Sequence, residues 1–408
     1  MVLSISNTLL DKVRFTLLAL LIISLPFSVA LTNIICGLLV LYWLLFYDNK
    51  KGVLVILKEN PVVLFAYLLF FSFVISLLWS DDLERGFKVI SKEVFLLFIP
   101  IFMQLIKNEE RDTLIKLFIF AMSISVFISY MVYFEILDFI PKASKFDPAP
   151  FMLHTSYNPL LAFAIYLSIY YFFQIKETRL KVFIAFLIII MSINMFITGG
   201  RAGQIAFFVL LLVAFFQFTK VNILKIVGFL IFLVFTSILA YNFSFTFKKR
   251  VNAAIHDIKV INENRNTDVG LRITMWENSI RTIKNNPLFG TGGGDFFKEY
   301  KKISEKYTPN AISDVVQPHN MYLFVWASNG VFSFLFLIGL FLTQLIISFK
   351  KNDKFKPIRL ALALFFIVIM FSESYLLIFH TTVLYMIFAS ILYKDVNWDD
   401  IKKIKKRF

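Results

Sequence analysis

The chain has 408 residues, of which 59% are hydrophobic and 17% are charged, and its formal net charge is +15. A soluble protein of this length could not bury so much apolar surface, so the composition indicates a polytopic membrane protein and excludes a soluble enzyme. The apolar runs are continuous over about 16–25 residues, whereas the strands of a membrane barrel alternate apolar and polar residues over about 10 positions. We therefore predict an all-α membrane fold.

The positive charge does not indicate nucleic-acid binding. Much of it lies in short loops and in the tail from Lys402 to Arg407, as expected when cytoplasmic Lys and Arg orient a membrane protein. We therefore expect the protein to contact membrane lipids and to have no nucleic-acid partner. Lys12 and Arg14 precede the first apolar run without a small-residue cleavage site after it, so we expect a retained first helix.

The apolar runs predict about twelve transmembrane helices. The first two runs and the last two runs are close together, so each pair is either two spans or one hairpin. The candidate spans are 15–30, 32–47, 61–79, 88–106, 113–138, 156–174, 179–198, 202–218, 223–243, 321–348, 358–376 and 378–393.

The distribution of Lys and Arg between the loops predicts the orientation. With the N-terminus in the cytoplasm, basic loops fall on the inside through all twelve spans, and both termini are cytoplasmic. The chain then divides into four parts. These are 1–243 with helices one to nine, 244–320 as a large outer loop with short helices, 321–393 with helices ten to twelve, and 394–408 as a basic cytoplasmic tail.

The outer loop 244–320 is the feature that a simple membrane anchor would not need. It has 12 Lys and Arg against 8 Asp and Glu, and long loops translocate largely regardless of charge. Binding of an anionic group is the simplest reason for this excess. Residues 271–280 predict an amphipathic helix that ends near Pro287. The cluster from Gly290 to Gly294 is either a turn or a phosphate cradle, and it lacks the Gly-Lys-Ser/Thr ending of a Walker motif.

Three basic residues, Arg201, Arg272 and His319, meet at the outer face by topology. Arg201 follows Gly199-Gly200 and opens a helix, where amide groups and the helix dipole favour anions; the alternative is an arginine that reaches the lipid head groups. A guanidinium group binds phosphate oxygens in bidentate fashion. His319, between Pro318 and Asn320, is a candidate general base. No Cys, His or carboxylate spacing predicts a metal site.

Three further residues are candidates for the same site. His154 and Tyr157 lie where a short outer loop leads into the predicted span 156–174. Glu373 is a carboxylate near the outer end of the span 358–376, and such residues are usually functional and paired. A structural ion pair with an arginine is the alternative for Glu373. No hydrolase triad can be assembled from the sequence.

Taken together and in order, five motifs resemble the core of the O-antigen ligase and polymerase superfamily. The resemblance covers about residues 190–345, and the twelve-span layout extends it to the whole chain. Where many members have Ser-Arg-Gly, this chain has Gly200-Arg201-Ala202, so the arginine is kept. The motifs are Thr198-Gly199-Gly200-Arg201-Ala202-Gly203; Arg272-x3-Trp276; Asn286-Pro287-Leu288-Phe289-Gly290-Thr291-Gly292; Pro318-His319-Asn320-x-Tyr322-Leu323; and Ser328-Asn329-Gly330-Val331-Phe332.

The resemblance implies a bacterial inner-membrane glycosyltransferase with a GT-C-like fold, inverting and independent of metal or other cofactors. The donor would be a glycan on undecaprenyl pyrophosphate at the periplasmic face. A ligase would move it to a sugar hydroxyl of lipid A-core, and a polymerase would move it to the next repeat unit. Arg201 and Arg272 would hold the pyrophosphate, and His319 would act as general base. The supporting candidates are Gly200, Gly292, Asn320, Tyr322, His154, Tyr157 and Glu373.

A transporter of lipid-linked glycans is the competing hypothesis from the sequence. Its sign would be two related halves with interrupted helices, and no such symmetry is visible. Between a ligase and a polymerase, the single large outer loop favours the ligase.

Overall fold

The long apolar runs fold into helices. The computed structural model describes residues 7–402 except 48, 141–142, 310–314 and 316. Within these ranges there is no β-strand, and the one β-type pairing is an isolated antiparallel bridge between Ser144 and Asp147. The predicted all-α fold is confirmed. Residues 310–314 and 316 of the outer loop and residues 403–408 of the basic tail lie outside the described residues.

Helices follow one another along most of the chain. They are α1 (Asn7–Ser24), α2 (Val29–Phe46), α3 (Gly52–Glu59), α4 (Pro61–Ile75), the 3₁₀ helix η1 (Ser76–Trp79), α5 (Leu83–Glu93), α6 (Phe95–Leu105), η2 (Asn108–Glu110), α7 (Arg111–Tyr133), α8 (His154–Gln174), α9 (Thr178–Ile197), α10 (Arg201–Phe218), α11 (Ile223–Phe243), α12 (Phe245–Lys259), α13 (Asp268–Asn285), α14 (Phe296–Tyr307), α15 (Met321–Lys350), α16 (Lys356–Ile369), α17 (Phe379–Leu392) and α18 (Asp399–Lys402).

Each predicted span coincides with one or more helices, and several of these helices are long and apolar enough to cross a membrane. In the described part of the chain seven segments meet that standard, which makes this a multi-pass membrane protein. The remaining predicted spans coincide with helices that are shorter or more polar, so the count of twelve stays a prediction. The seven segments are Val29–Phe46, Pro61–Trp79, Asn108–Tyr133, Thr178–Ile197, Arg201–Phe218, Ile223–Phe243 and Met321–Lys350.

The predicted span 88–106 forms two helices rather than one. Asp82 caps the first, α5, by accepting a hydrogen bond from the Arg85 amide, so this helix starts before the predicted span. The helical pattern is interrupted at Val94, where the Leu97 amide bonds to the Val94 carbonyl in the tighter 3₁₀ manner. Pro100 follows inside α6 and cannot donate a backbone bond, which weakens the helix over the turn before it.

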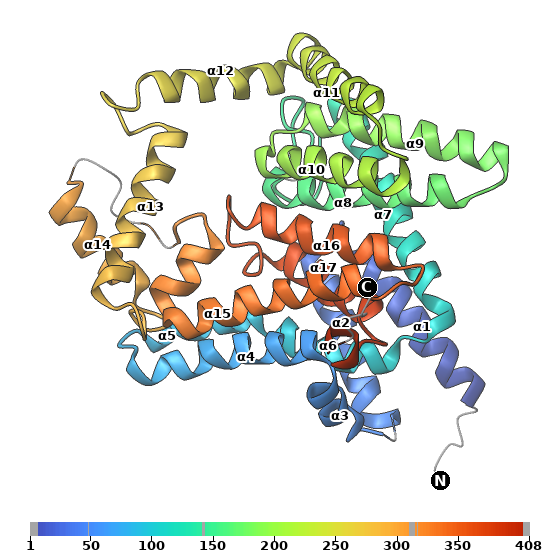
Figure 1. Cartoon of the computed structure of the whole chain (residues 1–408), viewed down its shortest axis with the longest axis horizontal. Helices are drawn as coiled ribbons and strands as arrows, with labels where there is room; N and C mark the ends of the chain where they lie inside the picture. Colours follow the sequence, from blue (N-terminus) through green and yellow to red (C-terminus); the bar gives the residue numbers. More distant parts are fainter. Residues whose placement is uncertain (1–6, 48, 141–142, 310–314, 316, 403–408) are drawn as a thin grey trace.

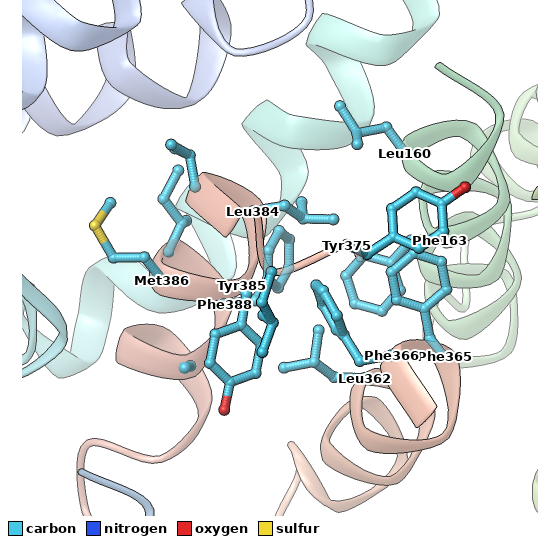
Figure 2. Packing of buried hydrophobic residues seen from close by; sticks show 14 of the residues in the cluster. Leu160, Phe163, Leu362, Phe365, Phe366, Tyr375, Leu384, Tyr385, Met386 and Phe388 are labelled. Atoms are coloured by element: carbon cyan, nitrogen blue, oxygen red, sulfur yellow. The ribbon is translucent and has the colours of Figure 1, made fainter. Parts of the chain in front are cut away.

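The core lies where α8, α16 and α17 pack together. Figure 2 shows Phe163 of α8 beside Phe365 of α16 and Phe388 of α17, with ring centroids 5.4 and 4.9 Å from that of Phe163. In lipid, helices associate through close packing and polar contacts, because burial against another helix removes no water. The Tyr166 hydroxyl accordingly bonds to Gln217 of α10 and to the backbone carbonyl of Pro357.

The helices of the predicted outer loop gather at one end of the molecule. Figure 1 shows α12 running from the end of α11 towards α13 and α14, on the left of the view. Helix α13 covers the predicted helix 271–280, which is confirmed and is longer than predicted, since the side chain of Thr267 caps it at Gly270. Helix α11 stands at the edge of the bundle, and of its 21 residues only Ala240 is buried.

The glycine-rich segment and the adjacent Asp295 contact other parts of the protein. The Asp295 carboxylate accepts hydrogen bonds from the Ser80 hydroxyl at 2.8 Å and from two backbone amides, those of Asp81 at 2.6 Å and Asp82 at 3.1 Å. On the other side, α15 breaks at Gly330, whose φ of 83° is in the left-handed region; a β-carbon there would lie 2.1 Å from the Leu288 carbonyl oxygen. The segment therefore joins the large loop to the N-terminal half.

Candidate functional site

A cavity of about 240 Å³ lies where the outer-loop helices meet the ends of α8 and α10. Six of the residues that the sequence singles out line it: His154, Gly200, Arg201, Arg272, His319 and Glu373. They come from five separate parts of the chain, so the fold brings them together. The full lining is His154, Thr155, Gly199, Gly200, Arg201, Ala202, Arg250, Asp268, Leu271, Arg272, Met275, His319, Ser372, Glu373 and Tyr375.

The glycines before and after Arg201 allow α10 to press against α8. A β-carbon on Gly200 would lie 2.5 Å from the His154 carbonyl oxygen, and one on Gly203 would lie 2.3 Å from the backbone of Asn158. Asn158 also donates hydrogen bonds to the carbonyls of Met195 and Gly200. This packing holds the first turn of α10, and Arg201 with it, at the wall of the cavity.

Arginine side chains dominate the charge of the cavity. Arg201 Nη2 lies 3.2 Å from a carboxylate oxygen of Asp268, and Arg250 Nη1 lies 3.9 Å from the same oxygen. The buried Arg201 Nε has no hydrogen-bond partner within the described residues. Three guanidinium groups, those of Arg201, Arg250 and Arg272, thus face one cavity, with a single carboxylate between two of them.

Arg250 and Asp268 were missed by the sequence reasoning. Arg250 ends the run Lys248-Lys249-Arg250 in α12, a helix that the apolar pattern does not mark. The run of basic residues was a signal, but nothing in it distinguishes the arginine that points into the cavity. Asp268 is the first residue of α13, where an acidic residue commonly stabilises the helix start, so its sequence context gave no reason to select it.

His319 forms a pair with Glu373. The distance from His319 Nδ1 to Glu373 Oε2 is 2.5 Å, and the other oxygen of Glu373 accepts a bond from the Ser374 amide at 3.0 Å. The partner of Glu373 is therefore this histidine and not an arginine. His319 has a φ of 50°, unusual for a residue with a side chain, and the Trp276 indole bonds to the carbonyl of Pro318 just before it. The carboxylate orients the ring and leaves Nε2 for another partner.

His154 forms a second pair of the same kind. Its Nδ1 lies 2.5 Å from one oxygen of Asp147, and the other oxygen of Asp147 accepts a bond from the Gly199 amide at 3.2 Å. Asp147 was also missed, because it lies seven residues before His154 in a loop whose conformation the sequence does not reveal. The pair connects the start of α8 to the glycines that precede α10.

Four of the supporting candidates lie outside the cavity lining. Tyr157 is fully buried and donates to Asn194 at 2.8 Å. Asn320 caps α15 by accepting from the Leu323 amide, and the Tyr322 hydroxyl bonds to the Ile367 carbonyl. Gly292 belongs to the glycine-rich segment, and its amide donates to the backbone carbonyl of Ser328 in α15.

Among the residues whose structure is described, no group of three or more His, Cys, Asp and Glu side chains could hold a metal ion. The charged groups that line the cavity are instead guanidinium groups, imidazoles and the carboxylates of Asp268 and Glu373. Such an arrangement can bind a multiply charged anion and, beside it, can transfer a proton.

Comparison with known proteins shows to which family the chain is similar. A family model described as O-antigen ligase matches residues 186–338, a range that contains Arg201, Arg250, Arg272 and His319. The chain is also similar to an uncharacterized protein of Haemophilus influenzae (strain ATCC 51907 / DSM 11121 / KW20 / Rd), with 30% identity over 322 residues that cover 76% of this chain and 77% of the relative. The chain belongs to the O-antigen ligase and polymerase superfamily.

Proposed function

We propose that the protein is an O-antigen ligase-like glycosyltransferase. It moves a glycan from undecaprenyl pyrophosphate to a sugar hydroxyl of lipid A-core at the periplasmic face of the inner membrane, without a metal and with inversion at the anomeric carbon. The observation that carries the proposal is one cavity with three arginines and a His319–Glu373 pair. A polysaccharide polymerase of the same superfamily, which differs in the acceptor, is the second candidate.

The arginines supply what the donor needs. A pyrophosphate gains negative charge as its bond to the sugar breaks, and preorganised guanidinium groups stabilise that charge where it develops. Arg201 is also the first residue of α10. The first turn of a helix presents free amides and about half a positive charge from the helix dipole, so the backbone at this position favours the anion as well. Arg272 comes from α13 and Arg250 from α12, so the anion would be held from three helices.

His319 supplies the base. With Nδ1 held by Glu373, Nε2 takes the proton from the acceptor hydroxyl as its oxygen attacks the anomeric carbon from the face opposite the pyrophosphate. Glu373 is 11% exposed, and its negative charge stabilises the imidazolium ion that forms. A positioned base of this kind accelerates transfer by about 10²–10⁴-fold.

An apolar groove beside the cavity supports a lipid-linked donor. It has a volume of about 490 Å³ and lies between α10, α11 and α12. Phe247 and Val251, which line it, flank Arg250 along α12, so the same helix borders both the arginines and the groove. In this proposal the groove holds the first isoprene units while the pyrophosphate reaches the arginines. The groove residues are Phe208, Leu233, Val234, Ser237, Ile238, Tyr241, Phe247 and Val251.

The test of the transfer reaction uses purified protein in detergent with a lipid-linked glycan donor and lipid A-core. The wild-type protein should release undecaprenyl pyrophosphate and extend the core, and His319→Gln should do neither at a measurable rate. Consumption of donor at the normal rate by His319→Gln would refute the base assignment. In a separate measurement with the protein reconstituted into vesicles, movement of donor across the membrane without transfer would favour a transporter instead.

The choice between ligase and polymerase rests on the acceptor. Deletion of the gene followed by analysis of the surface polysaccharide separates the two. Loss of all glycan-capped core supports the ligase, whereas core that carries a single repeat unit supports the polymerase.

A further inference from the structure

We infer that His154, held by Asp147, is the general acid of the transfer and gives its proton to the departing pyrophosphate. This inference rests on the glycosyl transfer proposed above and adds a role that the general base does not explain. The site would then use one histidine at each end of the reaction, with His319 receiving a proton and His154 donating one.

The first observation is the way His154 is held. Its Nδ1 lies 2.5 Å from Asp147, so the hydrogen of Nδ1 points to that carboxylate and Nε2 is the nitrogen left for a ligand. The second oxygen of Asp147 is occupied by the Gly199 amide at 3.2 Å, which fixes the carboxylate itself. The ring is 24% exposed and lines the cavity. A histidine oriented by a carboxylate in this manner is arranged for proton transfer.

The second observation is the place of His154 among the groups that bind anions. A β-carbon built on Gly199 would lie 3.3 Å from Arg250 Nη2 and 3.5 Å from His154 Nδ1, so the guanidinium group and the imidazole meet beside the same glycine. Arg201 begins α10 two residues later. His154 therefore lies with the arginines, on the wall where a phosphate would bind, whereas His319 is held by Glu373 from the connection between α16 and α17.

The step balances in protons and charge. The acceptor oxygen forms its bond to the anomeric carbon, and its proton passes to Nε2 of His319. The bond between that carbon and the phosphate oxygen breaks, and the oxygen takes the proton from Nε2 of His154. Afterwards His319 loses its proton to solvent and His154 regains one, so the cycle consumes only donor and acceptor.

The charged groups around His154 come from several elements. Asp147 is the carboxylate in contact with its ring. The charged and titratable groups facing the same cavity are Arg201, Arg250, Asp268, Arg272, His319, Glu373 and Tyr375.

The experiment is the pH dependence of kcat/KM for transfer by the detergent-purified full chain. The wild-type profile should be bell-shaped, falling at low pH as His319 is protonated and at high pH as His154 loses its proton. His154→Gln should lower the rate about 10–10²-fold and abolish the fall at high pH. His319→Gln should instead remove activity at every pH.

A donor with sulfur in place of the bridging oxygen gives a second measurement. Its leaving group needs no proton, so His154→Gln should transfer that glycan within about 3-fold of the wild-type rate, since a missing acid costs nothing there. A bell-shaped profile retained by His154→Gln, or an equal loss with both donors, would overturn the inference and leave the transferase itself intact. Wild-type protein without any transfer would instead refute the proposed function.

Asp147→Asn tests the same inference if His154→Gln does not fold. Asn keeps a polar group beside Gly199 and His154 but removes the carboxylate that orients the ring. Transfer from the oxygen-bridged donor should then fall about 10-fold or more, whereas transfer from the sulfur-bridged donor should stay within about 3-fold of the wild-type rate. An equal loss with both donors would contradict the assignment.

Discussion

Asp268 occupies the arginine cluster, so removal of its charge should increase the affinity of the site for pyrophosphate. Its carboxylate lies 3.2 Å from Arg201 and 3.9 Å from Arg250, the groups that would bind the donor. A bound pyrophosphate must displace this carboxylate or lie beside it. In either case Asp268→Asn removes a competitor for the same donors.

The exposure of Asp268 sets the size of the effect. The side chain is 63% exposed, so each of its ion pairs is worth about 0.2–1 kcal/mol after solvent screening. Release of two such pairs corresponds to about 0.4–2 kcal/mol, which is an affinity about 2- to 30-fold higher. The gain should shrink as salt concentration rises, because exposed charges are screened within about 8–10 Å.

The assay is titration calorimetry with inorganic pyrophosphate at low and high salt. Glu277→Gln is the matched control, because Glu277 lies on the same helix but pairs with Arg265 at 2.8 Å and does not line the cavity. This control should bind pyrophosphate as the wild-type protein does. Weaker binding by Asp268→Asn would show that the carboxylate positions the arginines for the ligand, and would refute the view that it competes with the ligand.

Three other changes test the site and its support. Glu373→Gln should lower kcat about 10²–10³-fold with little change in donor affinity, since the base loses its orienting carboxylate; single-turnover kinetics would show this, and an unchanged kcat would contradict it. Arg250→Ala should raise the KM for donor about 10-fold or more, the loss of a charged hydrogen bond, whereas Lys249→Ala, next to it but outside the cavity lining, should leave KM within about 2-fold. Asp295→Ala should lower the free energy of unfolding by about 2–4 kcal/mol in detergent melts, because three bonds to residues 80–82 are lost, and equal stability would refute the role of this segment.

The sequence predicted the membrane helices well because long apolar runs have few alternatives in lipid. It also predicted α13, whose apolar stripe repeats at helical spacing. Helices α12 and α14 were not individually predicted, since their faces are largely polar and their packing depends on the rest of the loop. The division of the chain into an outer loop and flanking spans remains a prediction about orientation.

Most of the charged residues that line the cavity could be selected from the sequence, but some of the residues that pair with them could not. Arg201, Arg272, His319, His154 and Glu373 could be selected because charged groups at a membrane face are few and need a reason. Two partners could not be selected, Asp147 of His154 and Asp268 of Arg201, because these pairs depend on how separate segments of the chain come together. Gly292 was selected but does not line the cavity. Its glycine-rich run could cradle a phosphate by composition, and in the structure it lies between two parts of the protein.

The contact of Asp295 with Ser80 also bears on how the protein is made. These two residues are 215 positions apart in the chain. His319 and Glu373, the second pair, are 54 positions apart. A ribosome adds residues in order, so α4 and α5 reach the membrane long before the segment that fastens to them has been synthesised. The cavity can close only when nearly the whole chain has emerged. A nascent or truncated protein that already contained all three arginines would still lack the carboxylate that orients its base.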